Sequence, residues 1–437
     1  MNGDCGDDTH SNCSCPKQNI ENEGQEKSAH DQSRRDFIRY SGIAGIGLGL
    51  GPALPWWLQD KGKSDELRQS SVLKNGKAQR ITILHTSDIH GQLDIHDEFF
   101  WENEKAVFKK RGGFATLQTL IKELRKQNPG NTLLVDGGDC FQGSGIASLT
   151  QGRALMPLIN QMKYDLVLPG NWEVMFGKKV LLEDMNGYAA AKVCANMFNS
   201  DDVAQELLFP PYQIFDVGGI RIGFVGYNDP LTPVRQSPAY SKGIRFTKPE
   251  VDLQKYVKIL KDEKGCKLVF VVSHMGMAQQ LNLANESCAE GVNYILGADT
   301  HERIRVPIQG KFSKVTEPGA FASFVGKLDI VIEDGKIKDE AYELIDVDPE
   351  RYKEDDEMKR LVSSIKKPYR KELARVIGQT TTPLLRYYII ETPMDNFITD
   401  ALIWNLKTDV VISNGFRFCP PLVPDAKTGK ADITSDY

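Results

Sequence analysis

Several classes of protein are excluded by what this 437-residue chain lacks. It has no excess of basic residues, because its net charge is −5, and this argues against a nucleic-acid-binding protein. We therefore expect a small-molecule partner and no nucleic acid. The eight cysteines have neither the spacing of a zinc ribbon nor the density of a disulfide scaffold. No internal repeat is visible, so a solenoid or repeat array is not expected.

The N-terminal residues 1–75 are predicted to be a polar tail, an export signal and a linker. The segment Ser33-Arg34-Arg35-Asp36-Phe37-Ile38 precedes a small, glycine-rich apolar stretch from Ile43 to Leu54. This order is typical of a twin-arginine signal, and the apolar stretch is too short to span a bilayer as a helix. We expect a periplasmic or cell-envelope protein whose signal is either cleaved or retained as a membrane anchor. The alternative is an amphipathic helix preceded by two arginines by chance.

From Arg80 onward, short apolar runs alternate with helical patterns. The runs at residues 81–84, 132–135 and 268–272 are continuous and β-rich, whereas residues 114–125 have apolar residues at helical spacing. Continuous apolar runs predict strands buried on both faces, as in a sheet covered by helices. We therefore expect an α/β or α+β fold.

Four segments are expected along the chain. After residues 1–75 come a main domain over 76–345, a charged linker helix over 346–375 and the start of a smaller α/β C-terminal domain over 376–437. Residues 322–333 and the turn at Gly335 predict a closing antiparallel hairpin. About sixty residues are too few for an independent α/β domain, so we expect the sequence to be partial.

Polar motifs directly follow five of the apolar runs. They are Asp88-Ile89-His90, Gly138-Asp139, Gly170-Asn171-Trp172-Glu173, Ser273-His274-Met275-Gly276 and Asp299-Thr300-His301. Since the carboxyl ends of parallel strands meet at one edge of a sheet, we expect these side chains to converge. Each motif alone is compatible with a turn or a hydrogen-bonded polar residue, and only their combination indicates metal binding.

The combined side chains predict a site for two divalent metal ions. Ions about 3.5–4 Å apart need a bridging carboxylate with imidazole, carboxylate and amide ligands. Asp139 is the expected bridge. The first ion is assigned to Asp88, His90 and His301, and the second to Asn171, His274 and Asp299. Such a pair activates water, so no serine or cysteine nucleophile is required, and we count Asn171 among the catalytic residues as well.

Three segments resemble signature blocks of the calcineurin-like metallophosphoesterases, and within them the secreted 5'-nucleotidases. These segments are Ile83–Gly91, Arg111–Ala115 and Val135–Ser144. The resemblance covers Ile81 to about Asp346 strongly and Val376 to Tyr437 less strongly. It implies a four-layer αββα sandwich, a di-metal centre and a C-terminal domain that supplies the substrate pocket. It also implies hydrolysis of a phosphate ester, such as that of a nucleotide.

The sequence departs from the family pattern at three places. Where the family has a His followed three residues later by an Asp, this chain has Trp172 and Met175, and neither can shuttle a proton as imidazole does. Asp299 replaces one imidazole of a Gly-His-x-His block, which favours manganese or iron(II) over zinc. Phe397 follows the asparagine after which relatives have a substrate-binding arginine.

Trp172 and the segment Gly415-Phe416-Arg417 resemble a second branch, the di-manganese thiosulfohydrolases of sulfur-oxidising systems. That branch implies hydrolysis of a cysteine S-sulfonate held by a carrier-protein partner. Arg417 is predicted to be a catalytic and substrate-binding residue that grips an oxyanion, or else a surface or interdomain arginine. Asn196 and Trp172 are further candidates for the substrate pocket, and packing alone is the alternative role for Trp172. A third hypothesis is a non-catalytic metal-binding envelope protein.

Overall fold

The computed structural model describes residues 78–201, 203–204, 206–388, 391–413 and 419–437. The predicted export signal and Arg417 lie outside these described residues. Within them, every helix is too short or too polar to cross a bilayer.

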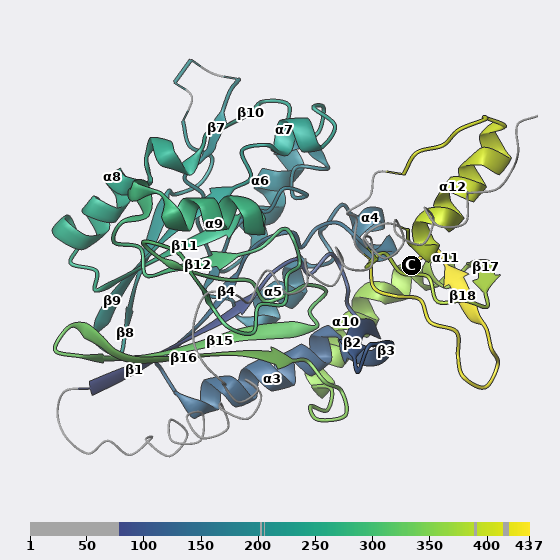
Figure 1. Cartoon of the computed structure of the whole chain (residues 1–437), viewed down its shortest axis with the longest axis horizontal. Helices are drawn as coiled ribbons and strands as arrows, with labels where there is room; N and C mark the ends of the chain where they lie inside the picture. Colours follow the sequence, from purple (N-terminus) through teal and green to yellow (C-terminus); the bar gives the residue numbers. More distant parts are fainter. Residues whose placement is uncertain (1–77, 202, 205, 389–390, 414–418) are drawn as a thin grey trace, which may run out of the picture. The chain divides into compact units, whose positions relative to one another are not determined.

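Two six-stranded sheets form the centre of the protein (Figure 1). The first has the order β16-β15-β1-β4-β5-β6, with β1, β4, β5 and β6 parallel and β15 and β16 antiparallel to their neighbours. Its strands are β1 Ala78–Thr86, β4 Thr132–Asp136, β5 Leu166–Val167, β6 Ala191–Lys192, β15 Phe324–Glu333 and β16 Lys336–Asp346. The predicted hairpin is confirmed, because β15 and β16 pair across the turn at Gly335.

The second sheet has the order β13-β14-β12-β11-β9-β8, in which β9, β11, β12 and β14 are parallel. Its strands are β8 Tyr212–Val217, β9 Ile220–Asn228, β11 Leu268–His274, β12 Tyr294–Gly297, β13 Ile308–Gln309 and β14 Lys314–Thr316. Three two-stranded pairs complete the strands of the described chain: β2 Ile95–Glu102 with β3 Lys105–Gly112, β7 Met197–Asn199 with β10 Ile244–Phe246, and β17 Val376–Thr380 with β18 Ala431–Thr434.

The strand β11 shows why its apolar run is continuous. Phe270 and Val272 belong to the buried cluster that also contains residues of the first sheet, and Phe270 stacks on Phe224 of β9 at 5.2 Å. Val269 and Val271 point the other way, into a second cluster with side chains of the helices α8 and α9. Because both faces are buried, alternation with polar residues is absent, as the sequence predicted.

Helices cover the sheets. They are α3 Phe114–Gln127, α4 Gly145–Thr150, α5 Met156–Met162, α6 Gly177–Gly187, α7 Thr232–Arg235, α8 Leu253–Lys258, α9 Met277–Asn285, α10 Asp356–Lys366, α11 Arg370–Leu373 and α12 Pro393–Leu406. Helix α3 and helix α10 pack on each other along the first sheet (Figure 1). The predicted α/β sandwich with a smaller C-terminal portion is therefore confirmed.

The linker region contains less helix than predicted. A helix was expected over residues 346–375, but α10 ends at Lys366 and is followed by a 3-10 turn and the four-residue α11. Pro368 lies in this turn, and proline lacks the backbone N–H that a continuing helix needs. The expected domain boundaries remain predictions.

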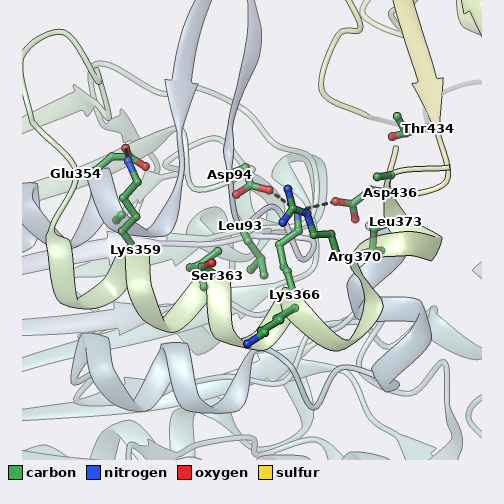
Figure 2. Close-up of a pocket in the computed structure, with 14 residues that line it drawn as sticks. Leu93, Asp94, Glu354, Lys359, Ser363, Lys366, Arg370, Leu373, Thr434 and Asp436 are labelled. Atoms are coloured by element: carbon green, nitrogen blue, oxygen red, sulfur yellow. Dashed lines mark hydrogen bonds and ion pairs between the residues drawn. The ribbon is translucent and has the colours of Figure 1, made fainter. Parts of the chain in front are cut away.

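A cavity of about 800 Å³ lies where α10 and α11 approach the C-terminal strand β18 (Figure 2). At its centre, the ammonium group of Lys366 pairs with the carboxylates of Asp94 and Asp436, the latter at 2.7 Å. Val362 and Leu373 supply apolar lining. Lys366 thus ties the end of the described chain to the loop that follows His90.

Replacement of Phe270 by alanine tests the packing between the sheets. Because the ring is fully buried between the two sheets, we expect Phe270→Ala to lower the free energy of unfolding by about 3–5 kcal/mol, measured by urea denaturation. The matched control is Trp101→Ala, which truncates a ring that is 64% exposed and should change it by about 0.5 kcal/mol or less. Equal effects of the two substitutions would contradict this account of the core.

Candidate metal centre

The predicted ligands converge at the carboxyl ends of the parallel strands of both sheets. Asp88 and His90 follow β1, Asp139 follows β4, Asn171 follows β5, His274 ends β11, and Asp299 and His301 follow β12. Strands of different sheets thus deliver side chains that are more than 200 residues apart in the chain, such as His90 and His301.

Two overlapping groups of side chains have the composition of a metal site. The first contains Asp88, His90 and His301, and the second contains Asp88, Asp139 and His274; within each, ligand atoms lie within 4.8 Å of one another. In the first group, the Nε2 atoms of His90 and His301 are 3.0 Å apart. In the second, His274 Nε2 lies 3.1 Å from Asp139 Oδ2.

The two carboxylates lie between the imidazoles of both groups. Asp139 Oδ2 is 3.8 Å from His90 Nε2, although it belongs to the second group. Asp88 Oδ1 is 3.5 Å from His301 Nε2 and 3.9 Å from His274 Nε2, so Asp88 is shared by both groups. Either carboxylate is therefore placed where a bridging ligand would be needed, whereas the sequence suggested only Asp139.

Backbone carbonyl groups orient two of the imidazoles. The Nδ1–H of His274 donates to the carbonyl oxygen of Gly137 at 2.7 Å, and that of His90 donates to the carbonyl of Gln142 at 3.0 Å. Because Nδ1 donates in this way, each ring directs its Nε2 atom toward the cluster, which is the arrangement of metal-binding histidines.

The carboxylates and imidazoles of the centre shift one another's pKa values. Burial alone would raise the pKa of Asp88, but His301 and His274 hold this pKa below its ordinary value. Burial would likewise lower the pKa of His274, but Asp139 and Asp88 raise it well above the usual value. Buried carboxylates thus draw positive charge into the site, and nitrogen and oxygen donors of this kind suit a divalent ion. The residues present therefore fit a metal centre.

The backbone is strained at the ligands. Asp88, His90, Asp139, Asp299 and His301 all have positive φ angles, between 51° and 86°. For residues other than glycine this conformation costs on the order of 1 kcal/mol each, so the surroundings must hold it in place. A glycine is also required nearby, because a Cβ atom on Gly170 would lie 2.2 Å from Asp139 Oδ1.

Glu173 holds two of the ligand loops together. Its buried carboxylate accepts backbone N–H groups from Asp139 at 2.9 Å, Cys140 at 2.6 Å, Phe141 at 3.1 Å and Gly170 at 2.5 Å. The Gly-Asn-Trp-Glu motif was recognised in the sequence, but no role was predicted for Glu173. The sequence placed Glu173 in this motif but gave no signal for its partners, because three of its donors are 32 to 34 residues away in the chain.

The remaining predicted residues have different surroundings. Trp172 is partly buried, and its backbone N–H donates to Asp139 Oδ1 at 2.8 Å. Asn196 is fully buried, its amide donating to the carbonyls of Asn228 and Thr247 and accepting from the N–H of Asn228. The hydrogen-bonding groups of Asn196 thus connect buried loops, and its place in the substrate pocket remains a prediction.

Asn171 and Asp299 lie beside the second group of ligands. Asp299 Oδ1 is 3.8 Å from His274 Nε2 and accepts a hydrogen bond from Asn171 Nδ2 at 2.7 Å. Asp299 also pairs with Arg235, which was not predicted from the sequence. A signal existed for Asp229, the other carboxylate that pairs with Arg235, because Asp229 directly follows the apolar strand β9 as the recognised motifs follow their strands.

Replacement of Glu173 by glutamine tests the connection between the two loops. The NH₂ group of glutamine cannot accept a hydrogen bond, so some of the backbone N–H groups that now donate to Glu173 would lose their acceptor. We therefore expect Glu173→Gln to weaken metal binding by about 10–100-fold, measured by titration of Mn²⁺. The control is Glu183→Gln, which alters a half-exposed carboxylate on α6 and should leave metal binding unchanged. Unaltered affinity in Glu173→Gln would show that the ligand loops do not depend on this contact.

The chain is similar in sequence to a curated relative. The chain is 26% identical over 354 residues to the snake venom 5'-nucleotidase of Gloydius brevicauda, covering 74% of this chain but only 58% of that protein. This chain therefore spans little more than half the length of that curated relative.

The fold is shared with solved structures. The sulfate thiohydrolase SoxB of Thermus thermophilus matches 82% of this chain and 72% of its own with a TM-score of 0.73 and 22% identity. A 5'-nucleotidase precursor from Thermus thermophilus matches 75% and 67%, with a TM-score of 0.66 and 24% identity. The family model for calcineurin-like phosphoesterases matches residues 81–303, which is about half of the chain and includes all seven predicted ligands. The chain belongs to the calcineurin-like phosphoesterase family.

Proposed function

We propose that this protein is an exported hydrolase that uses two divalent metal ions to cleave a phosphate ester, such as that of a nucleotide or a related compound. The observation that supports this most strongly is the cluster of three imidazoles and two carboxylates in which Asp88 is shared by both groups. The family membership and the name of the venom relative support the same reaction class.

The ligand assignment follows the two groups. Asp88, His90 and His301 would hold the first ion, and Asp139 and His274 the second, with Asn171 and Asp299 beside it. Bound ions of this kind supply Lewis acidity and activate water near neutral pH. The backbone N–H of Trp172 fixes Asp139, and the carbonyls of Gly137 and Gln142 fix the imidazoles. These contacts preorganise the centre before the ions bind.

The oxygen ligands favour manganese, with iron(II) and zinc as the alternatives. We further propose export by the twin-arginine route to the periplasm or cell envelope, with residues 76–345 as the metal-binding domain, 346–375 as the linker and 376–437 as part of the C-terminal domain. Arg417 remains our candidate for gripping the oxyanion of the substrate.

A second candidate is hydrolysis of a cysteine S-sulfonate carried by a protein partner. Trp172 supports it, because an indole cannot protonate a leaving group at the position where relatives have a histidine. An alcohol leaving group needs such a proton, whereas a cysteine thiolate, with a pKa of about 8.5, can leave without one. In this reaction hydroxide attacks the sulfonate sulfur, the S–S bond breaks, and the products are a thiolate and hydrogen sulfate. The name of the solved sulfate thiohydrolase is consistent with this chemistry.

Replacement of Asp139 by asparagine tests the binuclear centre. The substitution keeps the shape but removes the negative charge shared between the groups, so we expect the loss of one metal ion. Turnover should fall on the order of 10³-fold, because several kcal/mol of charge stabilisation are lost. Metal content by elemental analysis and turnover of an aryl phosphate measure the two effects. Asp216→Asn, at an exposed position on β8, is the matched control. Retention of both ions with full turnover in Asp139→Asn would contradict the proposed function.

A comparison of substrates separates the candidates. We expect the Mn²⁺-loaded protein to release phosphate from nucleoside monophosphates, because the chain is a calcineurin-like phosphoesterase and its named relative is a 5'-nucleotidase. The same preparation is offered an S-sulfonated cysteine peptide, and sulfate is measured. Faster release of sulfate than of phosphate would favour the second candidate. Two bound ions with neither product would instead favour the non-catalytic metal-binding protein considered from the sequence.

A further inference from the structure

Arg235 lies at the end of α7, next to the second group of ligands. Its guanidinium contacts both carboxylate oxygens of Asp299, with Nη1 2.8 Å from Oδ2 and Nη2 3.2 Å from Oδ1. Nη1 is also 2.6 Å from Oδ2 of Asp229, which is fully buried. This two-pronged geometry is the strongest arrangement between an arginine and a carboxylate, and the guanidinium charge is permanent.

The contact involves the same oxygen atoms that a metal ion would need. Asp299 Oδ1 lies 3.8 Å from His274 Nε2, at the edge of the second group, and also accepts from Asn171. Asp299 is not a member of either group whose ligand atoms lie within 4.8 Å of one another. Arg235 engages both Asp299 oxygens and places a permanent positive charge beside the second position.

We propose that Arg235 sets the affinity of the second metal position by competing with the ion for the carboxylate of Asp299. The inference rests on the proposed function, since it assumes that the cluster binds two ions. Arg235 is a positioning residue in this account, because it acts through Asp299. The first ion binds tightly to Asp88, His90 and His301, and the second binds more weakly because it must displace the guanidinium from Asp299.

When Arg235 is replaced, Asp229 keeps the two hydrogen bonds that reach its Oδ1 atom. Asp229 Oδ1 also accepts hydrogen bonds from Gln279 Nε2 and from the backbone N–H of Leu231, both at 3.0 Å. The glutamine of Arg235→Gln can still donate one hydrogen bond but carries no charge. Arg235→Lys keeps the charge without the paired donors, so the two variants separate charge from geometry.

The test is titration of the metal-free full chain with Mn²⁺ by isothermal calorimetry, with stoichiometry confirmed by elemental analysis. We expect Arg235→Gln to tighten the second binding event by about tenfold or more and to leave the first within about twofold. Arg235→Lys should lie between wild type and Arg235→Gln. The matched control is Arg221→Gln, which breaks an exposed pair with Asp216 at the other end of β9 and should change neither event.

A double variant identifies the route of the effect. In Asp299→Asn the competition is absent, so adding Arg235→Gln should no longer tighten the second event. If wild type binds two ions and both Arg235 variants leave the second event unchanged or weaker, the inference is overturned while the proposed function stands. If wild type binds no second ion at any Mn²⁺ concentration, the binuclear function itself fails, and the inference fails with it.

Discussion

The geometry of the centre depends on one buried carboxylate that is not itself a predicted ligand. Glu173 accepts backbone N–H groups from the Asp139 loop and from Gly170, and thereby holds the loops after β4 and β5 at a fixed separation. Burial, followed by repulsion from Asp139, raises the pKa of Glu173 to about 8, and the backbone donors oppose this rise. Without such a contact, two short loops with several unpaired N–H groups would have to be buried beside a charged cluster, which is costly.

Strain and charge are concentrated at the same rim. Five predicted ligands have left-handed backbone conformations, and their side chains place carboxylates against imidazoles in a buried site. Both features cost free energy in the chain alone, and binding of a cation between the side chains would offset that cost. The two sheets supply the rigidity this requires, because their shared aromatic and aliphatic core fixes the strand ends from which the loops emerge.

The second group of ligands differs in kind from the first. In the first, two imidazoles and a carboxylate face one another, whereas beside the second lies Asp299, which is paired with Arg235 and Asn171. Arg235 is shared between Asp299 and Asp229, so its single positive charge offsets only part of the negative charge of these two carboxylates. The backbone N–H of Trp172 contacts the same group through Asp139 Oδ1.

Local sequence patterns were enough to specify the α/β fold and the strand-end positions of the predicted ligands, because continuous apolar runs and the polar motifs after them are read within a few residues. They could not specify which carboxylate lies between the groups, that Glu173 joins two loops, or that Asn196 is buried among backbone carbonyls, since these depend on contacts between distant segments. Arg235 was missed for the same reason, because its partner Asp299 is 64 residues away in the chain. These contacts arise from the packing of the two sheets, because it brings the loops of separate strands to one rim.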